Sequence, residues 1–318
     1  MKATNLIGAT VALTLAAGAT AQAAEWPTQP VQIIVPSKPG GGTDVMARIF
    51  SDYLARETGG DVVVVNIDGG GGSIAYNQVM TAAPDGNTIL FNHTGLLAGY
   101  HTGHSDIGLD DFTTIAVAQS YAPQVYAVAA DAPWDTMKEF VDDARANPGA
   151  RTVAVSLGRT THFIAGLIMM NEDVDLKLLE ASAEVDKVAA IQGGHIEMGN
   201  LGAGSAKQYE QAGDMKVLCL LDPEPHPAYP EYETCVQQGV NVSWLAPLVL
   251  WGPKDMDPDL VATINAATAG MAGDATAQDA LKKADSVFTY YDVEGAQELM
   301  ATEDAKIAAL AERLGLSR

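Results

Sequence analysis

The stretch VQIIVPSKPGGGTDVMAR, residues 31–48, decides the fold class, because it joins an apolar β-branched run directly to a glycine-rich turn and the start of a helical pattern. The runs VVVVNI (62–67) and TILFNH (88–93) have the same apolar character, and segments of helical period at 44–56 and 74–82 separate the three runs. Strands that are apolar on both faces and alternate with helices pair in parallel through βαβ crossovers. The sequence therefore predicts an α/β fold.

A second α/β set follows further along the chain. Its strands and helices are expected at 152–158, about 161–171, 175–181, near 186–192 and 215–221. Two long β-prone segments, 112–130 and 240–253, are each broken by a proline and are interpreted as chain crossings between two lobes. The tail 258–314 has a helical period and is expected to pack on the first lobe. The predicted division is lobe 1 at 24–120 plus 250–318, and lobe 2 at 121–249.

The N-terminal residues have the pattern of a signal peptide. Lys2 precedes an apolar run at 6–19, and Ala21-Gln22-Ala23 has the small-x-small form that signal peptidase cleaves. The apolar run is shorter than the ~20 residues that a bilayer requires. We expect residues 1–23 to be removed and the mature protein to be periplasmic, without membrane insertion. No cysteine follows the cleavage site, so a lipid anchor is not expected.

The excess of acidic over basic residues disfavours some classes of binding partner. The chain has 40 Asp and Glu against 18 Lys and Arg, which gives a formal net charge of −22. Such an acidic surface repels phosphate backbones and anionic lipid, so nucleic acid is not expected as a partner. An adaptation to a saline habitat is an alternative explanation that composition leaves open. We expect the protein to be a monomer.

The two cysteines, Cys219 and Cys235, lie close in sequence in a chain that would fold in an oxidising compartment. The two cysteines could form a disulfide or remain two separate buried thiols. The distance between them determines which, and the sequence does not give that distance. Neither cysteine lies in a spacing typical of metal ligands. We therefore expect no metal site.

Two glycine-rich loops each follow a strand and begin a helix. Residues 36–44 could present free amides to an anion, or could form a tight turn that Thr43 or Asp44 caps. The second loop, 68–73, lacks both the Gly-Lys-Ser/Thr of a Walker loop and the spacing of a dinucleotide fingerprint. We therefore expect no cofactor. Ligands of open parallel sheets lie at the carboxyl ends of the strands, where both loops are expected.

Three motifs, VQIIVPSKPGGGTDVMAR, VVVVNIDGGGGSIA and APDGNTIL, resemble in order and spacing the receptors of tripartite tricarboxylate transporters, also called Bug proteins. DDFTTIAV, IQGGHIEMG and GPKDM extend the resemblance over nearly the whole mature chain. The resemblance implies a two-lobe periplasmic-binding-protein fold (type II-like), with two crossings between the lobes and a ligand cleft between them. It also implies a solute-binding receptor that captures a small organic acid and delivers it to membrane permease subunits.

Carried over by position, the resemblance also implies the ligand contacts. Residues 39–44 would hold a first carboxylate, with the Thr43 hydroxyl donating and Asp44 ordering the loop, and the second lobe would meet the far end of the ligand. His162 matches a family histidine, for which a backbone-bonded position at a helix start is favoured over ligand contact. The full set of expected ligand-binding residues is Ser37, Lys38, Pro39, Gly40, Gly41, Thr43, Asp44, Gly71, Ser73, Asn92, His93, Thr94, Gly158, Arg159, Thr160, Thr161 and Asn200.

This sequence departs from the common family pattern in the distal half of the pocket. Ser37-Lys38 replaces an aromatic residue, residues 181–183 replace a Tyr-Lys-Gly, and 200–202 replace an Asp-Asn region. The ligand therefore cannot be named from the resemblance. A second acidic group on the ligand would require a full cation, and Arg159 on the opposing lobe is a better candidate than Lys38 because its planar fork pairs both carboxylate oxygens. A solvent-facing arginine beside a turn is the alternative.

Two other function classes remain open from the sequence. An enzyme on the same scaffold would need a catalytic constellation, but the six histidines are scattered and no GxSxG is present. The pair His101 and His104, beside Asp106 and Asp110, is interpreted as a solvated loop in preference to a metal site. A sensory receptor that signals its closed state differs from a transport receptor only in its partner, which sequence does not show.

Overall fold

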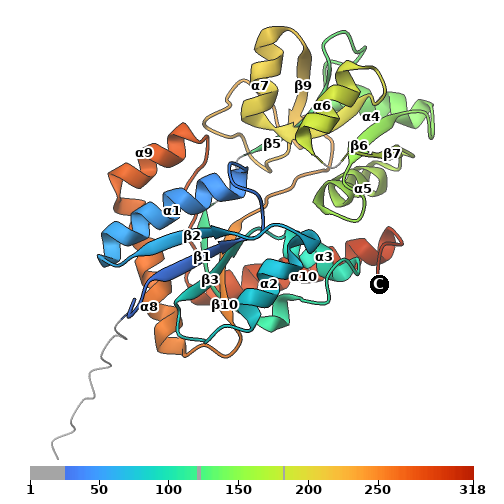
Figure 1. The fold of residues 1–318 in the computed structure, drawn as a ribbon. Coiled ribbons are helices and arrows are strands. Elements are labelled where there is room, and N and C mark those ends of the chain that lie inside the picture. Colours follow the sequence, from blue (N-terminus) through green and yellow to red (C-terminus); the bar gives the residue numbers. More distant parts are fainter. Residues whose placement is uncertain (1–25, 120–122, 182) are drawn as a thin grey trace, which may run out of the picture.

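The computed structural model describes residues 26–119, 123–181 and 183–318, and within them ten strands form two five-stranded sheets. Each sheet is the centre of one lobe (Figure 1). The first sheet has the order β2-β1-β3-β10-β4 and the second β7-β6-β8-β5-β9. The strands are β1 (Val31–Val35), β2 (Val62–Asn66), β3 (Thr88–Asn92), β4 (Phe112–Gln119), β5 (Gln124–Ala129), β6 (Thr152–Val155), β7 (Lys177–Glu180), β8 (Met198–Gly202), β9 (Met215–Leu220) and β10 (Leu248–Pro253).

The two sheets are built on one plan. Three strands pair in parallel, β1 with β2 and β3, and β6 with β7 and β8. The fourth strand is antiparallel and arrives from the other lobe: β10 pairs with β3 and β4, and β5 pairs with β8 and β9. The chain thus passes between the lobes twice, after β4 and after β9. The prediction of a two-lobe α/β fold with two crossings is confirmed, while the residue bounds of the lobes stay a prediction.

Helices cover both faces of the first sheet. Apolar strand residues point to both faces of the sheet: Ile33 and Leu250 pack with α1, α8 and α9, whereas Ile34 and Leu90 pack with α2, α3 and α10. The bounds are α1 (Gly42–Thr58), α2 (Ser73–Met80), α3 (Gly95–His101), α8 (Pro258–Ala269), α9 (Ala275–Lys283) and α10 (Val293–Arg313). The second lobe has α4 (Met137–Ala146), α5 (Thr160–Glu172), α6 (Glu184–Gln192) and α7 (Ala203–Ala212), and short 3-10 turns lie at Gly70–Gly72, Leu109–Asp111 and Gly270–Gly273.

The C-terminal helix contacts both lobes. As predicted for the tail, α10 packs on the first lobe, against β4 and α3, but it also reaches α5 of the second lobe (Figure 1). Leu314, just after α10, lies against Gly166 of α5, which has no side chain to exclude it. Arg318 stacks on the Tyr100 ring at 4.0 Å and donates its amide to the His101 carbonyl. The chain end therefore holds α3 in place beside the junction of the lobes.

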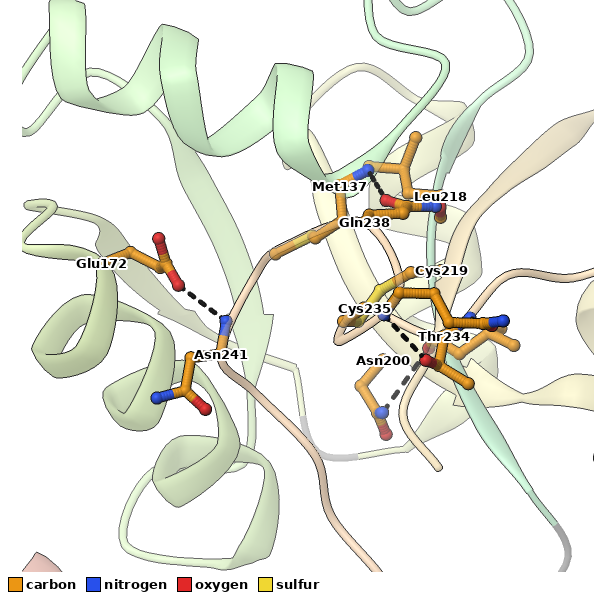
Figure 2. The surroundings of a disulfide bond; sticks show 11 residues. Met137, Glu172, Asn200, Leu218, Cys219, Thr234, Cys235, Gln238 and Asn241 are labelled. Carbon is orange, nitrogen blue, oxygen red and sulfur yellow. Dashed lines mark hydrogen bonds between the residues drawn. A yellow bond between two sulfur atoms is a disulfide. The ribbon is translucent and has the colours of Figure 1, made fainter. Parts of the chain in front are cut away.

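A disulfide fixes the start of the second crossing. Cys219 on β9 and Cys235 are joined, with their Cα atoms 5.0 Å apart (Figure 2). Gln238 donates to the Leu218 carbonyl at 2.8 Å and accepts from the Met137 amide at 2.8 Å, so it ties the same segment to α4. The crossing therefore leaves a cross-linked edge of the second sheet.

The predicted signal peptide, residues 1–23, lies outside the described residues. In the portion of the chain that the structure covers, every helix is too short or too polar to cross a bilayer.

Candidate functional site

A cavity of about 380 Å³ lies between the lobes, at the carboxyl ends of β1, β3 and β6. Glycines and polar side chains from both lobes form its walls. Its lining residues are Pro36, Asp68, Gly71, Gly72, Tyr76, Asn92, His93, Gly95, Gly99 and His104 from the first lobe, and Ser156, Arg159, Thr160 and Thr161 from the second.

The second-lobe wall is the turn between β6 and α5. The Ser156 amide donates to Thr161 Oγ1 at 2.7 Å, which closes the turn and holds both residues at the cavity. No side chain caps α5, because its N-cap residue is Arg159. The first turn of a helix carries unsatisfied amides and a partial positive charge. The cavity wall is therefore electropositive at Thr160 and Thr161.

Arg159 extends from this turn to the first lobe. Its Nη2 lies 2.9 Å from the position that a Cβ on Gly71 would occupy, so the guanidinium reaches the second glycine-rich loop because that loop lacks side chains. The residue is exposed, and no described carboxylate forms an ion pair with it. A cation that faces the cavity without an anionic partner is an arrangement suited to binding an acid.

Tyr76 and Asn92 form the base of the cavity in the first lobe. Asn92 Nδ2 donates to the Tyr76 hydroxyl at 3.0 Å, and both residues are 3% exposed. Gly72, with φ +101°, leaves room for the ring, since a Cβ there would lie 2.5 Å from the hydroxyl oxygen. Burial raises the pKa of Tyr76 to about 12, so its hydroxyl is protonated at neutral pH.

His93 lies at the carboxyl end of β3 and lines the same cavity. Its Nδ1 accepts a hydrogen bond from the Gly95 amide at 2.9 Å, which places the ring proton on Nε2. Burial lowers the pKa of His93 from 6.5 to about 4. The imidazole is therefore neutral at neutral pH and contributes no charge to anion binding.

The first glycine-rich loop is held by Asp44. Its carboxylate accepts from the Gly40 amide at 2.8 Å, from Arg48 at 2.9 and 3.0 Å, and from Asn66 at 2.9 Å. Burial opposes ionisation, but these hydrogen bonds outweigh it and lower the pKa of Asp44 below 3.8. Asp44 is thus fully occupied in ordering the loop, the role expected for it, and from this region Pro36 alone is among the lining residues of the cavity.

The structure brings part of the predicted set together. Gly71, Asn92, His93, Arg159, Thr160 and Thr161 line the cavity. His162 accepts the Gly158 amide at 3.0 Å through Nδ1, which is the backbone-bonded position favoured from the sequence. The predicted residues that do not line the cavity are Ser37, Lys38, Pro39, Gly40, Gly41, Thr43, Asp44, Ser73, Thr94, Gly158 and Asn200.

Sequence reasoning missed Tyr76 and His104. The interpretation of 101–106 as a merely solvated loop is incomplete, because His104 lines the cavity and Thr102 Oγ1 lies 3.0 Å from the Gly158 carbonyl of the other lobe. Thr102 also lies 2.8 Å from His104 Nδ1. No sequence pattern pointed to these contacts, since they depend on how the lobes meet.

Over residues 26–119, 123–181 and 183–318, no group of three or more His, Cys, Asp or Glu side chains is placed to hold a metal ion. The described lining of the cavity combines hydrogen-bond donors, the Arg159 guanidinium and one carboxylate, Asp68, which is paired with Lys38 at 3.8 Å. Chemically, it is suited to binding an anionic solute of modest size.

The sequence from 46 to 316 matches the family described as "Tripartite tricarboxylate transporter family receptor". The chain belongs to this family. Among relatives of this receptor, the Cupriavidus necator "UPF0065 protein in gbd 5'region" is 27% identical over 99% of the chain and 96% of its own length. The resemblance stated from the motifs is therefore confirmed.

Solved structures of the receptor family share the fold. A TctC solute-binding protein from Polaromonas, without ligand, has a TM-score of 0.77 and 26% identity, and the match covers 91% of this chain and 100% of that one. MatC from Rhodopseudomonas palustris, with bound malate, has a TM-score of 0.73 and 21% identity over 90% and 99% of the two chains. The family and these neighbours are solute-binding proteins.

Proposed function

We propose that this receptor captures a small organic acid in the periplasm for a tripartite tricarboxylate-type uptake system, and that it is not an enzyme. The observation that carries the proposal is the interlobe cavity in which Arg159 has no ion-pair partner among the described residues. A carboxylate would supply that partner.

The size of the cavity fits this class of ligand. Small-molecule sites typically occupy roughly 300–1,000 Å³, and this cavity, at about 380 Å³, is near the lower limit. The malate bound to the R. palustris neighbour is an acid of four carbons. That observation belongs to the neighbour, and it supports a ligand of similar size and charge here.

Electrostatics require the binding groups to act at short range. The net charge of −22 repels an anion at a distance, so affinity must come from donors inside the cleft, where screening by water is weaker. Arg159 and the start of α5 are such donors on the second lobe. Because they face the first lobe, an anion between the lobes would also favour closure of the cleft.

The cellular setting is part of the same proposal. The leader at 1–23 would direct the chain to the periplasm, and membrane permease subunits would receive the solute from the closed form. The family assignment supports both points.

A thermal-shift screen of the mature protein tests the proposal. Malate, succinate, adipate and citrate would each be compared with the corresponding amide. A ligand at a hundred times its Kd stabilises the folded state by roughly 2.7 kcal/mol, so a binder should raise the Tm while its amide does not. If no carboxylate of this panel raises the Tm, or if acids and amides act equally, the proposal fails.

A further inference from the structure

We propose that the Tyr76 hydroxyl is a ligand-binding donor that acts with Arg159 to hold one carboxylate of the solute across the two lobes. This inference rests on the proposed function, since it assumes that the cavity binds an organic acid. In this proposal, Tyr76 helps to select a carboxylate. Because Arg159 lies on the other lobe, binding of the same carboxylate by both residues also favours closure of the cleft.

The Tyr76 hydroxyl has a hydrogen that it can donate to a ligand. The oxygen already accepts from Asn92 Nδ2 at 3.0 Å, and Asn92 is itself buried on β3. No described residue accepts the hydroxyl hydrogen, although the side chain is only 3% exposed and lines the cavity. Buried hydroxyl groups normally find a partner for their hydrogen. The acceptor that is missing from the protein is therefore expected from the ligand.

The Tyr76 hydroxyl faces the ligand as a neutral donor. The tyrosine is protonated at neutral pH because burial disfavours the phenolate, so it offers a donor and no negative charge. Because the Tyr76 oxygen accepts from Asn92, the hydroxyl hydrogen points away from Asn92 and can be donated to an oxygen of the ligand. A carboxylate oxygen satisfies this donor, whereas an ammonium or amide N–H group does not.

The two donors, Tyr76 and Arg159, both lie against the second glycine-rich loop. Tyr76 approaches the backbone at Gly72, and Arg159 approaches it at Gly71, the adjacent residue. A side chain at either glycine would collide with one of them, at 2.5 Å from the tyrosine oxygen or 2.9 Å from Nη2. The two donors make no hydrogen bond to each other. We expect a carboxylate to meet one donor from each lobe beside these two glycines, which carry no side chains.

The alternative role for Tyr76 is packing alone, because its ring belongs to the apolar cluster that includes Val79 and Leu90. Tyr76→Phe separates the two roles, since it keeps the ring and removes only the hydroxyl. Tyr53→Phe is the matched control: Tyr53 is buried in the same lobe and its hydroxyl donates to the Ala267 carbonyl, on the helix α8 and outside the cavity lining.

Calorimetric titration with malate, succinate and adipate tests the proposal on wild type, Tyr76→Phe, Arg159→Ala and the double variant. We expect Tyr76→Phe to weaken binding of the dicarboxylates by about 10- to 150-fold, the range for one hydrogen bond to a charged acceptor. In the Arg159→Ala background the same change should have less than a twofold effect, because the carboxylate is no longer held between the lobes. Tyr53→Phe should alter the Tm and leave affinity unchanged.

The outcomes distinguish this inference from the proposed function. Wild-type protein that binds none of the three acids overturns both. Wild-type binding with full affinity in Tyr76→Phe overturns the inference and leaves the proposed function intact. If Tyr76→Phe lowers the affinity by the same factor in the presence and absence of Arg159, the two residues do not bind the same carboxylate and the inference is wrong.

Discussion

The turn after β1 and the turn after β6 occupy equivalent places in the two lobes, yet they use their charges differently. Each follows the central strand of a parallel triplet and begins a helix, α1 or α5. In the first turn, Asp44 and Arg48 pair with each other at 2.9 Å. In the second, Arg159 has no ion-pair partner among the described residues and lines the cavity with three neighbours.

The first turn has a structural role, and we propose a ligand-binding role for the second. The glycine-rich turn at 36–44 looks more like an anion site in the sequence, but Asp44 is satisfied by the Gly40 amide and by Arg48 of α1, and Lys38 pairs with Asp68 of the second glycine-rich loop. The turn at 156–161 has one glycine and an unpaired cation. We therefore propose that Arg159, and not the glycine-rich turn at 36–44, contacts the ligand.

The largest expected effect comes from removing the unpaired cation. Arg159→Ala should weaken dicarboxylate binding by roughly 2–5 kcal/mol, the range for truncating one partner of a charge pair that closure of the cleft removes from water. Lys38→Ala is the matched control, because its side chain is 83% exposed and its ion pair with Asp68 spans 3.8 Å. Calorimetry on both variants makes the comparison. A larger loss in the lysine variant would reverse the roles assigned to the two turns.

The disulfide at the β9 edge of the second sheet should affect stability more than affinity. Replacing Cys219 and Cys235 by alanine releases a loop with a sequence separation of 16, worth about 3 kcal/mol of unfolding free energy. Chemical denaturation measures this loss, and calorimetry should give a Kd within about threefold of wild type, because neither cysteine lines the cavity. Thiol titration of the unreduced, unfolded wild type should find no free thiol. Two free thiols would show that the sulfurs are not joined.

Asp44→Asn tests the scaffold role of the first turn. We expect a loss of about 1–2 kcal/mol of unfolding free energy at pH 7, below the full range for charged hydrogen bonds because the Arg48 side chain is half exposed. The folded-state pKa of Asp44 lies below 3.8, so its contribution is present above that value and is lost as the pH falls through the folded pKa. Denaturation curves of wild type and variant should therefore converge in acid. A constant difference down to pH 2 would contradict this assignment.

The smallest expected effect concerns the contact between the lobes. Thr102→Val keeps the shape of the side chain and removes the hydroxyl that lies 3.0 Å from the Gly158 carbonyl. That hydroxyl also lies 2.8 Å from the Ala98 carbonyl, so its hydrogen is shared and the loss should be about 1 kcal/mol. Stopped-flow measurement should show ligand dissociation about fivefold faster. Unchanged dissociation would mean that the contact does not hold the cleft closed.

The fold could be predicted from the sequence because its strands are apolar on both faces. The runs at 31–37, 62–67 and 88–93 coincide with β1, β2 and β3, and β1 ends at Val35, just before the proline that has no amide to donate. The crossings were found because a proline interrupts each β-prone segment. Periodicity and proline positions are local properties, so a single sequence contains them.

The site could be predicted only in part. Arg159 was identified because it follows a strand and begins a helix, which are local features. Tyr76 was missed because its position beside Ala75 and Val79 has the spacing of a core residue, and the ring is indeed buried. His104 was missed because its contact with Gly158 exists only once the lobes meet. Contacts across the cleft depend on tertiary placement, which no local pattern contains.

A crystal structure of the mature protein with bound malate would test the central claim most directly, because it shows which turn holds the carboxylates. We predict one carboxylate within about 3 Å of the Arg159 guanidinium, the distance of a charge-assisted hydrogen bond, with Thr160 and Thr161 beside it. A malate whose carboxylates contact residues 37–44 while Arg159 faces solvent would contradict the account.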